Sequence, residues 1–506
     1  MQFAAKLANA DDFTFLRMLW TLHALQTGRS DEASDFLSGY PPEAMTAGIL
    51  GQSAIYPWEL ETLANELLTT PKGPYRTFNC GDWNAVGHLV NGLRAVENAE
   101  YGVRRGELNV FIEMGRIAAR QFAWQRGFFD IPQLYRNAFI YGQGRCADYL
   151  QGSAGLAVSD MTFVGFALIS VFNSSPKIRP VSDLHLLHDW GIDSEALHRV
   201  LDRISRPIGE LRSVASLLRK VDLEVAYKPS ILRQFPCISG GHRNRDLVAP
   251  LPNLIMDRVT NGLFYDVIGG GGQVRDEIGR RFESYCLALF SDMLKGTRFV
   301  SEATYRTRLG PIVTPDILMF DDQGAVQLAI ECKASRMSVT ARFGDSPEGE
   351  RGYEEIAKGV TQLWRFFAHC RLRVAAERLA DDFQGLILTM DEWFAGRSTL
   401  IPQIIARAHC LADAGVHNIP IVDRRPVAFC TISELETVLS TATSMSLLEA
   451  IRIGSGERVG WIFSILHGEA KAEKTPPKDY PFLESLGELL PWYPRLIELR
   501  DDNAPN

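Results

Sequence analysis

The sequence predicts an α+β protein, with a mostly α-helical first half followed by an α/β domain whose mixed sheet is flanked by helices. From about residue 10 to 235, apolar residues recur at helical spacing, as in LNVFIEMGRIAARQFAW, while alternating β-branched runs are scarce. From about residue 264, apolar strand-like runs alternate with amphipathic helices. With 506 residues, of which 46% are hydrophobic and 23% charged, the chain has enough apolar material for several globular cores.

Composition restricts the class of protein further. The formal charge of −8 excludes a protein that is basic throughout, so any nucleic-acid surface must be a local patch. The eight cysteines form no C-x-x-C pair, which is typical of a reduced cytosolic protein. The first residues lack a basic region followed by an apolar core, and the most apolar window, 161–172, is too short to span a bilayer. We therefore expect a cytoplasmic protein without a membrane segment.

Breaks in the pattern divide the chain into segments. We expect a helical recognition or regulatory domain at 1–235, an irregular proline-rich connector at 236–264, a sheet-containing domain at 265–450 and a helical extension at 451–506. The glycine run 269–272 is not followed by the Gly-Lys-Ser/Thr of a phosphate-binding P-loop. It is interpreted instead as a flexible joint, because glycine restricts the backbone least.

The order of elements can be predicted in the second domain. It begins with a helix in QVRDEIGRRFESYCLALFSDML and a strand near 297–305. An apolar hairpin, a loop at SVTARFGDSPEGERG, an amphipathic helix in YEEIAKGVTQLWRFFAHC and a buried strand in FQGLILTMDEW follow. In RPVAFCTISELETVL, a strand runs into a helix that Ser433 and Glu436 are expected to cap.

The hairpin TPDILMFDDQGAVQLAIECKAS places acids and a lysine within apolar strands. A two-residue turn at Gln323 and Gly324, where the glycine accepts a positive φ, would set Asp316 directly opposite Glu331. Their Cβ atoms would then lie about 5 Å apart, close enough for both carboxylates to bind one divalent ion. The register therefore predicts a pair of carboxylates on one face of the sheet.

Lys333 extends this pattern. It lies two residues beyond Glu331, so its side chain leaves the same face of the strand. Two carboxylates and an ammonium group on one face would be costly to bury unless they hold a metal ion and a water molecule. Such a site suits metal-assisted attack of water on a phosphodiester, in which the lysine orients or deprotonates the water.

With these residues, the chain resembles the PD-(D/E)XK nuclease superfamily. Pro315-Asp316, followed after a turn by Glu331-Cys332-Lys333, matches its motif, and the resemblance covers about residues 265–440. It implies a restriction-endonuclease-like core and a Mg²⁺ ion, replaceable by Mn²⁺, held by Asp316, Glu331 and the backbone carbonyl of Cys332, with Lys333 serving the water. Family members often add a glutamate from the preceding helix and a glutamine from the following one. Glu283, which would also be a metal ligand, and Gln362 stand in the matching places, with the aromatic Phe366 nearby.

Simpler explanations exist for the same residues. The hairpin could be an exposed edge with solvated charges, although the alternation in QLAIECKA leaves both faces partly apolar, as in an internal strand. Glu283 could be an ordinary surface acid, with Glu277 as its substitute, and a glutamine such as Gln362 is common on helices. Cys332 and His369 could form a thiol nucleophile and base, but a cysteine on this strand is more simply a core residue. His185, His188, Asp189 and His198 lack a further ligand at zinc spacing.

A basic region precedes the second domain. Residues 199–258 contain eleven Lys/Arg and six acids, an excess of five positive charges in a chain of net charge −8. Arg219, Lys220, Arg243 and Arg245 are its candidates for contact with nucleic-acid phosphates, although a solvated helix face explains the same charges equally well.

Two functions follow from these expectations. The first is a Mg²⁺-dependent endonuclease. Its expected substrate is double-stranded DNA, with RNA left open as the alternative, and its helical half is expected to recognise a DNA feature, a signal, a partner protein or a second copy of the chain. The alternative is a non-cleaving nucleic-acid-binding or scaffold module. A nuclease domain joined to a large helical domain also resembles prokaryotic anti-phage effectors, an analogy at the level of architecture.

Overall fold

The computed structural model describes residues 2–46, 51–104, 110–240, 246–344, 349–394, 400–417, 419–471 and 475–502. The chain forms two compact units. Unit 1 comprises Met1–Leu108, Arg120–Gly270 and Leu486–Asn506, and unit 2 comprises Asn109–Ala119 and Gly271–Ser485. The division after Gly270 falls inside the glycine run that the sequence indicates as a joint.

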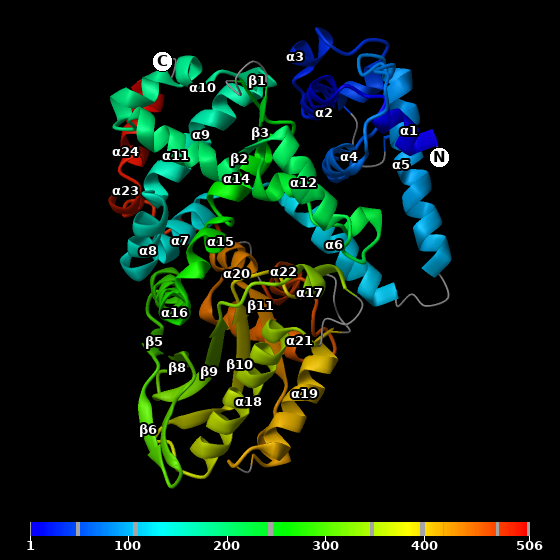
Figure 1. The fold of residues 1–506 in the computed structure, drawn as a ribbon. Helices are drawn as coiled ribbons and strands as arrows, with labels where there is room; N and C mark the ends of the chain where they lie inside the picture. Colours follow the sequence, from blue (N-terminus) through cyan, green and yellow to red (C-terminus); the bar gives the residue numbers. More distant parts are fainter. Residues whose placement is uncertain are drawn as a thin grey trace. The chain divides into compact units, whose positions relative to one another are not determined.

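Unit 1 is built mainly from helices (Figure 1). Among the described residues these are α1 (Gln2–Ala8), α2 (Asp12–Gln26), α3 (Ser30–Ser34), α4 (Pro57–Thr69), α5 (Trp83–Arg104), α6 (Val110–Arg126, shared with unit 2), α7 (Ile131–Tyr141), α8 (Gly144–Ala154), α9 (Val158–Ser174), α10 (Pro180–Asp183), α11 (Ser194–Ile204), α12 (Ile208–Leu218), α13 (Ile231–Gln234), α14 (Asn253–Val259), α15 (Leu263–Val267), α23 (Leu486–Leu489) and α24 (Trp492–Asp502). No single described helix is long and apolar enough to cross a bilayer, and only α8 and α9 together, bent by 70° at their break, pass that test.

Unit 1 also contains a four-stranded sheet that the sequence did not predict. Its order is β1-β4-β3-β2, from β1 (Lys177–Ile178), β2 (Ser205–Pro207), β3 (Cys237–Gly240) and β4 (Asp246–Val248). The segment 236–264 is therefore not an irregular connector, since it supplies β3, β4 and α14. Strands of two to four residues are too short to show an alternating pattern, which explains the wrong expectation.

Unit 2 contains the predicted mixed sheet flanked by helices. Its described elements are α16 (Gly272–Met293), β5 (Arg298–Ser301), β6 (Thr304–Thr307), β7 (Gly310–Val313), β8 (Ile317–Phe320), β9 (Ala325–Lys333), α17 (Val339–Phe343), α18 (Arg351–Arg371), β10 (Arg378–Thr389), α19 (Leu400–Ala414), β11 (Val427–Thr431), α20 (Ile432–Leu439), α21 (Ser444–Ser455) and α22 (Phe463–Ala470). The strand order is β11-β10-β9-β8-β5, with β9, β10 and β11 parallel and β8 antiparallel to both of its neighbours. The strand expected at 297–305 is split, because β6 leaves the sheet and pairs with β7.

The turn between β8 and β9 differs from the predicted one. The amide of Asp321 donates to the carbonyl of Ala325 at 2.8 Å, so three residues rather than two form the loop. Gly324 has the expected positive φ, at 71°, and its amide bonds back to the carbonyl of Asp321 at 3.0 Å. This is the three-residue hairpin in which glycine takes the left-handed position.

A bulge in β9 restores the predicted register. Phe320 pairs with Val326 but Met319 pairs with Leu328, which leaves Gln327 as an extra residue. Beyond the bulge, Ile317 lies opposite Ile330, as the sequence predicts. The two one-residue deviations cancel, so the register at the acidic end of the hairpin is confirmed.

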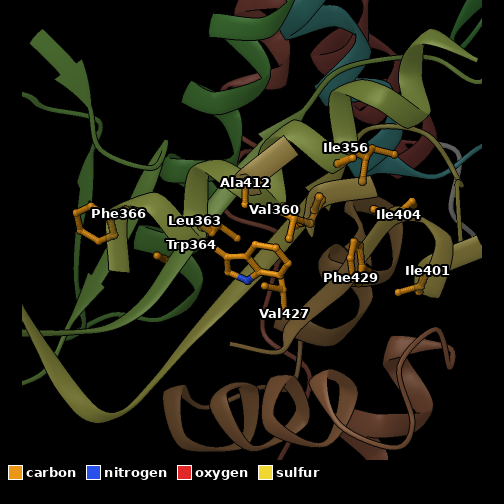
Figure 2. Packing of buried hydrophobic residues seen from close by; sticks show 14 of the residues in the cluster. Ile356, Val360, Leu363, Trp364, Phe366, Ile401, Ile404, Ala412, Val427 and Phe429 are labelled. Carbon is orange, nitrogen blue, oxygen red and sulfur yellow. The ribbon is translucent and has the colours of Figure 1, made fainter. Parts of the chain in front are cut away.

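The main core of unit 2 packs around α18. Trp364 is 1% exposed, and its indole nitrogen donates to the carbonyl of Arg425 at 2.8 Å. Figure 2 shows how α18 packs against residues of α19 and β11; the cluster includes Ile356, Val360, Leu363, Ile401, Ile404, Ala412, Val427 and Phe429. Phe366 is equally buried in this cluster. This packing fixes the rotation of α18, so that Gly359 faces strand β9.

Helix α20 is capped by residues other than those expected. The side chain of Thr431 accepts a hydrogen bond from the Glu434 amide at 3.3 Å, and the Glu434 carboxylate accepts one from the Thr431 amide at 3.2 Å. The capping box therefore begins two residues before Ser433, because β11 enters the helix with no connecting residue. Glu436 instead accepts a hydrogen bond from the buried Tyr285 hydroxyl at 2.5 Å.

Candidate active site

The predicted carboxylates meet beside the end of strand β9. Asp316 immediately precedes β8, one step beyond the pair Ile317 and Ile330, and that register sets it opposite Glu331. The Asp316 carboxylate accepts a hydrogen bond from the amide of Cys332 at 2.6 Å. Because β9 lies between β8 and β10, this contact is supported by strands on both sides.

Lys333 joins the carboxylates to helix α18. Its Nζ donates to Glu331 Oε1 at 2.8 Å and to Gln362 Oε1 at 3.3 Å. The structure thus brings Glu331 and Lys333 of β9 together with Gln362 of α18, as the sequence predicts. Gln362 holds the ammonium group from the helix side, which restricts where the lysine can reach.

The second carboxylate oxygen of Glu331 is the most informative atom of the site. The residue is only 2% exposed, and its Oε2 is buried without a hydrogen-bond partner in the described structure. An unpartnered buried carboxylate oxygen is costly, and a cation is the partner that offsets this cost best. With Asp316 opposite, the two carboxylates fit Mg²⁺, an ion that keeps several of its own waters. No described group of three or more His, Cys, Asp and Glu side chains is arranged to hold a metal ion by itself.

Burial and mutual repulsion raise the pKa values of Asp316, Glu331 and Glu283. Burial, and then the charge of Glu331, raises the pKa of Asp316 to about 8. Burial also raises the pKa of Glu331, although the nearby ammonium group of Lys333 opposes this shift. Burial alone would lower the pKa of Lys333, but the two carboxylates raise it above its ordinary value. Several perturbed pKa values within one cluster are typical of functional sites.

These pKa shifts predict how the protein responds to pH and to Mg²⁺. Between the ordinary pKa of 3.8 and the raised value of about 8, folded Asp316 binds a proton that the unfolded chain releases. Without metal, stability should therefore fall as the pH rises through this window. Mg²⁺ needs the charged carboxylate, so we expect its addition to raise the melting temperature more at pH 8 than at pH 6. Thermal melts at a fixed Mg²⁺ concentration measure both effects.

The variant Asp316→Asn is the comparison for those melts. It removes the titrating group, so the fall of stability with pH should become smaller and the Mg²⁺-induced shift should be lost. Equal Mg²⁺ shifts at pH 6 and pH 8 in the unmodified protein would contradict the assignment of Asp316.

Gly359 makes room for the lysine and the glutamate. A Cβ built at this position would lie 2.7 Å from Lys333 Cε and 3.2 Å from Glu331 Cγ. We expect Gly359→Ala to displace the flexible end of the lysine while the fold holds, and to lower any catalytic activity of this site about ten- to hundredfold. Activity assays and thermal melts on the purified variant test this expectation.

A matched control for that variant lies on α16. At Gly279, a Cβ would meet only Glu283 Oε1, at 3.9 Å, an ordinary contact. Gly279→Ala should therefore keep full activity and gain about 1 kcal/mol of helix stability. Equal losses of activity in the two variants would show that the loss does not come from the contact of the new methyl group with Lys333 and Glu331.

Glu283 and Glu277 are distinguished by their surroundings. Glu277 forms an ion pair with Arg281 at 2.9 Å, along the surface of α16. Burial raises the pKa of Glu283, and the charges of Glu302 and Glu331 raise it further, so this residue belongs to the acidic cluster. Its predicted role as a metal ligand stays a prediction.

Sequence reasoning missed two charged residues of this site. Glu302, between β5 and β6, raises the pKa of both Glu283 and Glu331. Arg365, three residues after Gln362 on α18, lowers that of Glu331, and its Nε is buried without a partner in the described structure. Arg365 could have been predicted, because residues three apart on a helix lie on the same face and Gln362 was already a candidate. Glu302 could not, because no sequence pattern indicated that β5 ends beside the hairpin.

The alternative thiol nucleophile does not fit its surroundings. A hydrogen bond to Cys286 and burial raise the pKa of Cys332 well above its ordinary value, whereas a nucleophilic thiol needs a lowered one. His369 Nδ1 is hydrogen-bonded to the hydroxyl of Tyr305 at 2.9 Å. The neighbouring side chains therefore have different contacts: Cys332 contacts Cys286, whereas Lys333 is hydrogen-bonded to Glu331 and Gln362.

The predicted basic residues lie elsewhere in the chain. Arg219 and Lys220 are exposed in unit 1, where Arg219 donates to the carbonyl of Thr69 at 3.2 Å. Arg243 and Arg245 lie outside the described residues. A role of these side chains in binding nucleic acid stays a prediction.

The family to which the chain belongs is not shown by comparison with other proteins. The comparisons with family models, with curated proteins and with solved structures each find no match.

Proposed function

We propose that the chain is a Mg²⁺-dependent endonuclease that hydrolyses phosphodiester bonds of DNA, on a core of the restriction-endonuclease type. The observation that carries this proposal is the buried, unpartnered Oε2 of Glu331 beside Asp316 and Lys333. A scaffold protein gains nothing from such a costly arrangement, whereas a cation site requires it.

The residues would divide the work as follows. Asp316 and Glu331 would hold Mg²⁺, together with the backbone carbonyl of Cys332. When bound, the ion supplies a water of lowered pKa and a counter-charge for the phosphate. Lys333, which is hydrogen-bonded to Glu331 and Gln362, would orient that water or donate to a phosphate oxygen.

The helical unit 1 would supply selectivity. The buried carboxylates of unit 2 are assigned to the chemistry, so recognition of a signal, a partner or a target feature is assigned to the other unit. A role in defence against phage is the biological setting that this combination suggests, by analogy of architecture alone.

The test is a cleavage assay on the purified full-length protein. Supercoiled plasmid, linear duplex, single-stranded DNA and RNA are incubated with Mg²⁺, with Mn²⁺ or with chelator. We expect cutting of DNA with either metal and none with chelator. Tight binding of DNA without cutting under every condition would favour the alternative, a non-cleaving nucleic-acid-binding module.

A further inference from the structure

Strands β6 and β7 form a ribbon that stands outside the main sheet. Thr304 pairs with Val313 and Thr307 with Gly310, and Arg308 and Leu309 make the turn. In the sequence, the ribbon lies between β5 and β8, and it ends directly before Pro315 and Asp316. Strand β6 is labelled at the lower left of Figure 1.

The ribbon has one packed face and one exposed face. The cross-strand pair Tyr305 and Ile312 is half-buried, whereas the pairs on either side of it are exposed. The exposed pairs are Thr304 with Val313 and Arg306 with Pro311. Alternation of this kind means that one face packs against the protein and the other is exposed to solvent.

Two sets of hydrogen bonds fix the ribbon, one at its own base and one to helix α18. At its base, the amide of Thr314 donates to the carbonyl of Ala303 at 2.9 Å, and the amide of Ala303 donates to the Thr314 hydroxyl at 3.0 Å. On its packed face, Tyr305 is hydrogen-bonded to His369 of α18 at 2.9 Å. The base lies next to Glu302 and two residues from Asp316, so the ribbon is joined to the acidic site by a short stretch of chain.

The exposed part of the ribbon is basic. Residues 303–314 contain Arg306 and Arg308 and no acid, in a chain of net charge −8. Both arginines are exposed, and in the described structure neither forms a hydrogen bond or an ion pair. Leu309 at the turn is 65% exposed. Free arginines beside an apolar tip suit contact with phosphates and base edges together.

We propose that this ribbon enters the major groove of double-stranded DNA and positions the duplex over the carboxylates. The major groove of B-form DNA is about 12 Å wide and admits a two-stranded ribbon, whereas that of A-form RNA is too deep and narrow. The inference deepens the proposed function, on which it rests, by naming duplex DNA as the substrate. Arg306 and Arg308 are its contact residues.

The test measures binding separately from cutting. Arg306→Ala and Arg308→Ala are combined in the Glu331→Gln background, and the affinity for a labelled 30-base-pair DNA duplex (about three helical turns) is measured by fluorescence anisotropy. We expect binding to weaken at least about tenfold and its dependence on salt to become shallower. Binding to a single strand of the same length should change less.

A matched control removes two positive charges near the start of β5, at the end of that strand that is distant from the ribbon. Lys295 and Arg298 are exposed there, and the strand runs from them toward the ribbon. Lys295→Ala with Arg298→Ala should keep duplex affinity within about twofold. The inference is overturned if this control weakens binding as much, if the parent protein does not bind duplex DNA, or if an RNA duplex is bound as tightly and with the same sensitivity.

The two proposals fail in different ways. If the protein cuts DNA but the ribbon variants bind and cut normally, the ribbon inference is wrong and the nuclease stands. If duplex binding depends on the ribbon but no metal supports cutting, the ribbon inference stands and the nuclease is wrong.

Discussion

Replacement of Glu331 by glutamine is expected to lower Mg²⁺-dependent cleavage on the order of a thousandfold or more. The substitution keeps the shape of the side chain but removes the charge whose Oε2 is buried without a partner. Asp316→Ala should be equally severe, because a divalent ion held by one carboxylate is neither fixed nor sufficiently neutralised. Single-turnover cleavage of plasmid over a range of Mg²⁺ concentrations measures the loss.

Glu277→Gln is the control for the two carboxylate variants. Glu277 lies on the helix that carries Glu283, but it forms an ion pair with Arg281 outside the cluster. It should cut at nearly the normal rate. Binding of DNA should survive or improve in the inactive variants, since a negative charge facing the phosphates is removed. A folded Glu331→Gln protein that cuts normally would disprove the metal-site assignment.

The second large loss of cleavage activity is expected from substitution of Lys333. Substitution of the neighbouring Cys332 should change the activity little. Lys333→Met removes the ammonium group that is held between Glu331 and Gln362, and activity should fall almost as far as in the carboxylate variants. Cys332→Ser should be mild for catalysis, because this residue is expected to contribute its backbone carbonyl while its side chain contacts Cys286.

The contrast between these neighbours is informative because both lie on β9 and share its stability. Rates of cleavage are compared at equal fractions of folded protein, checked by circular dichroism. An inactive Cys332→Ser protein together with an active Lys333→Met protein would reverse the assignment and restore the thiol nucleophile.

The predicted register of the hairpin is correct although the predicted turn is not, because two one-residue deviations offset each other. The register that sets Asp316 opposite Glu331 was derived from a two-residue turn, yet the turn has three residues and Gln327 absorbs the difference. The apolar alternation on both strands specifies this register more strongly than the turn does, because a slip would move every side chain to the other face.

Long periodic elements were predicted well and short ones were not. Helix α18 and strand β9 carry patterns over many residues, whereas β6, β7 and the strands of unit 1 have two to four residues each. The pairing of such strands depends on partners far away in the sequence. For the same reason Glu302 was not predicted as a neighbour of Glu283, since that contact depends on where strand β5 ends.

The central position of β9 has a consequence for how the site can fluctuate. Hydrogen-bonded strands flank β9 on both sides, β8 on one and β10 on the other, and seven of its nine residues are buried. Local opening in proteins starts at sheet edges, loops and termini, where few bonds must break. We therefore expect Glu331, inside β9, to lose its surroundings only when unit 2 unfolds as a whole, so that the free energy that keeps its side chain in place approaches that of the entire unit.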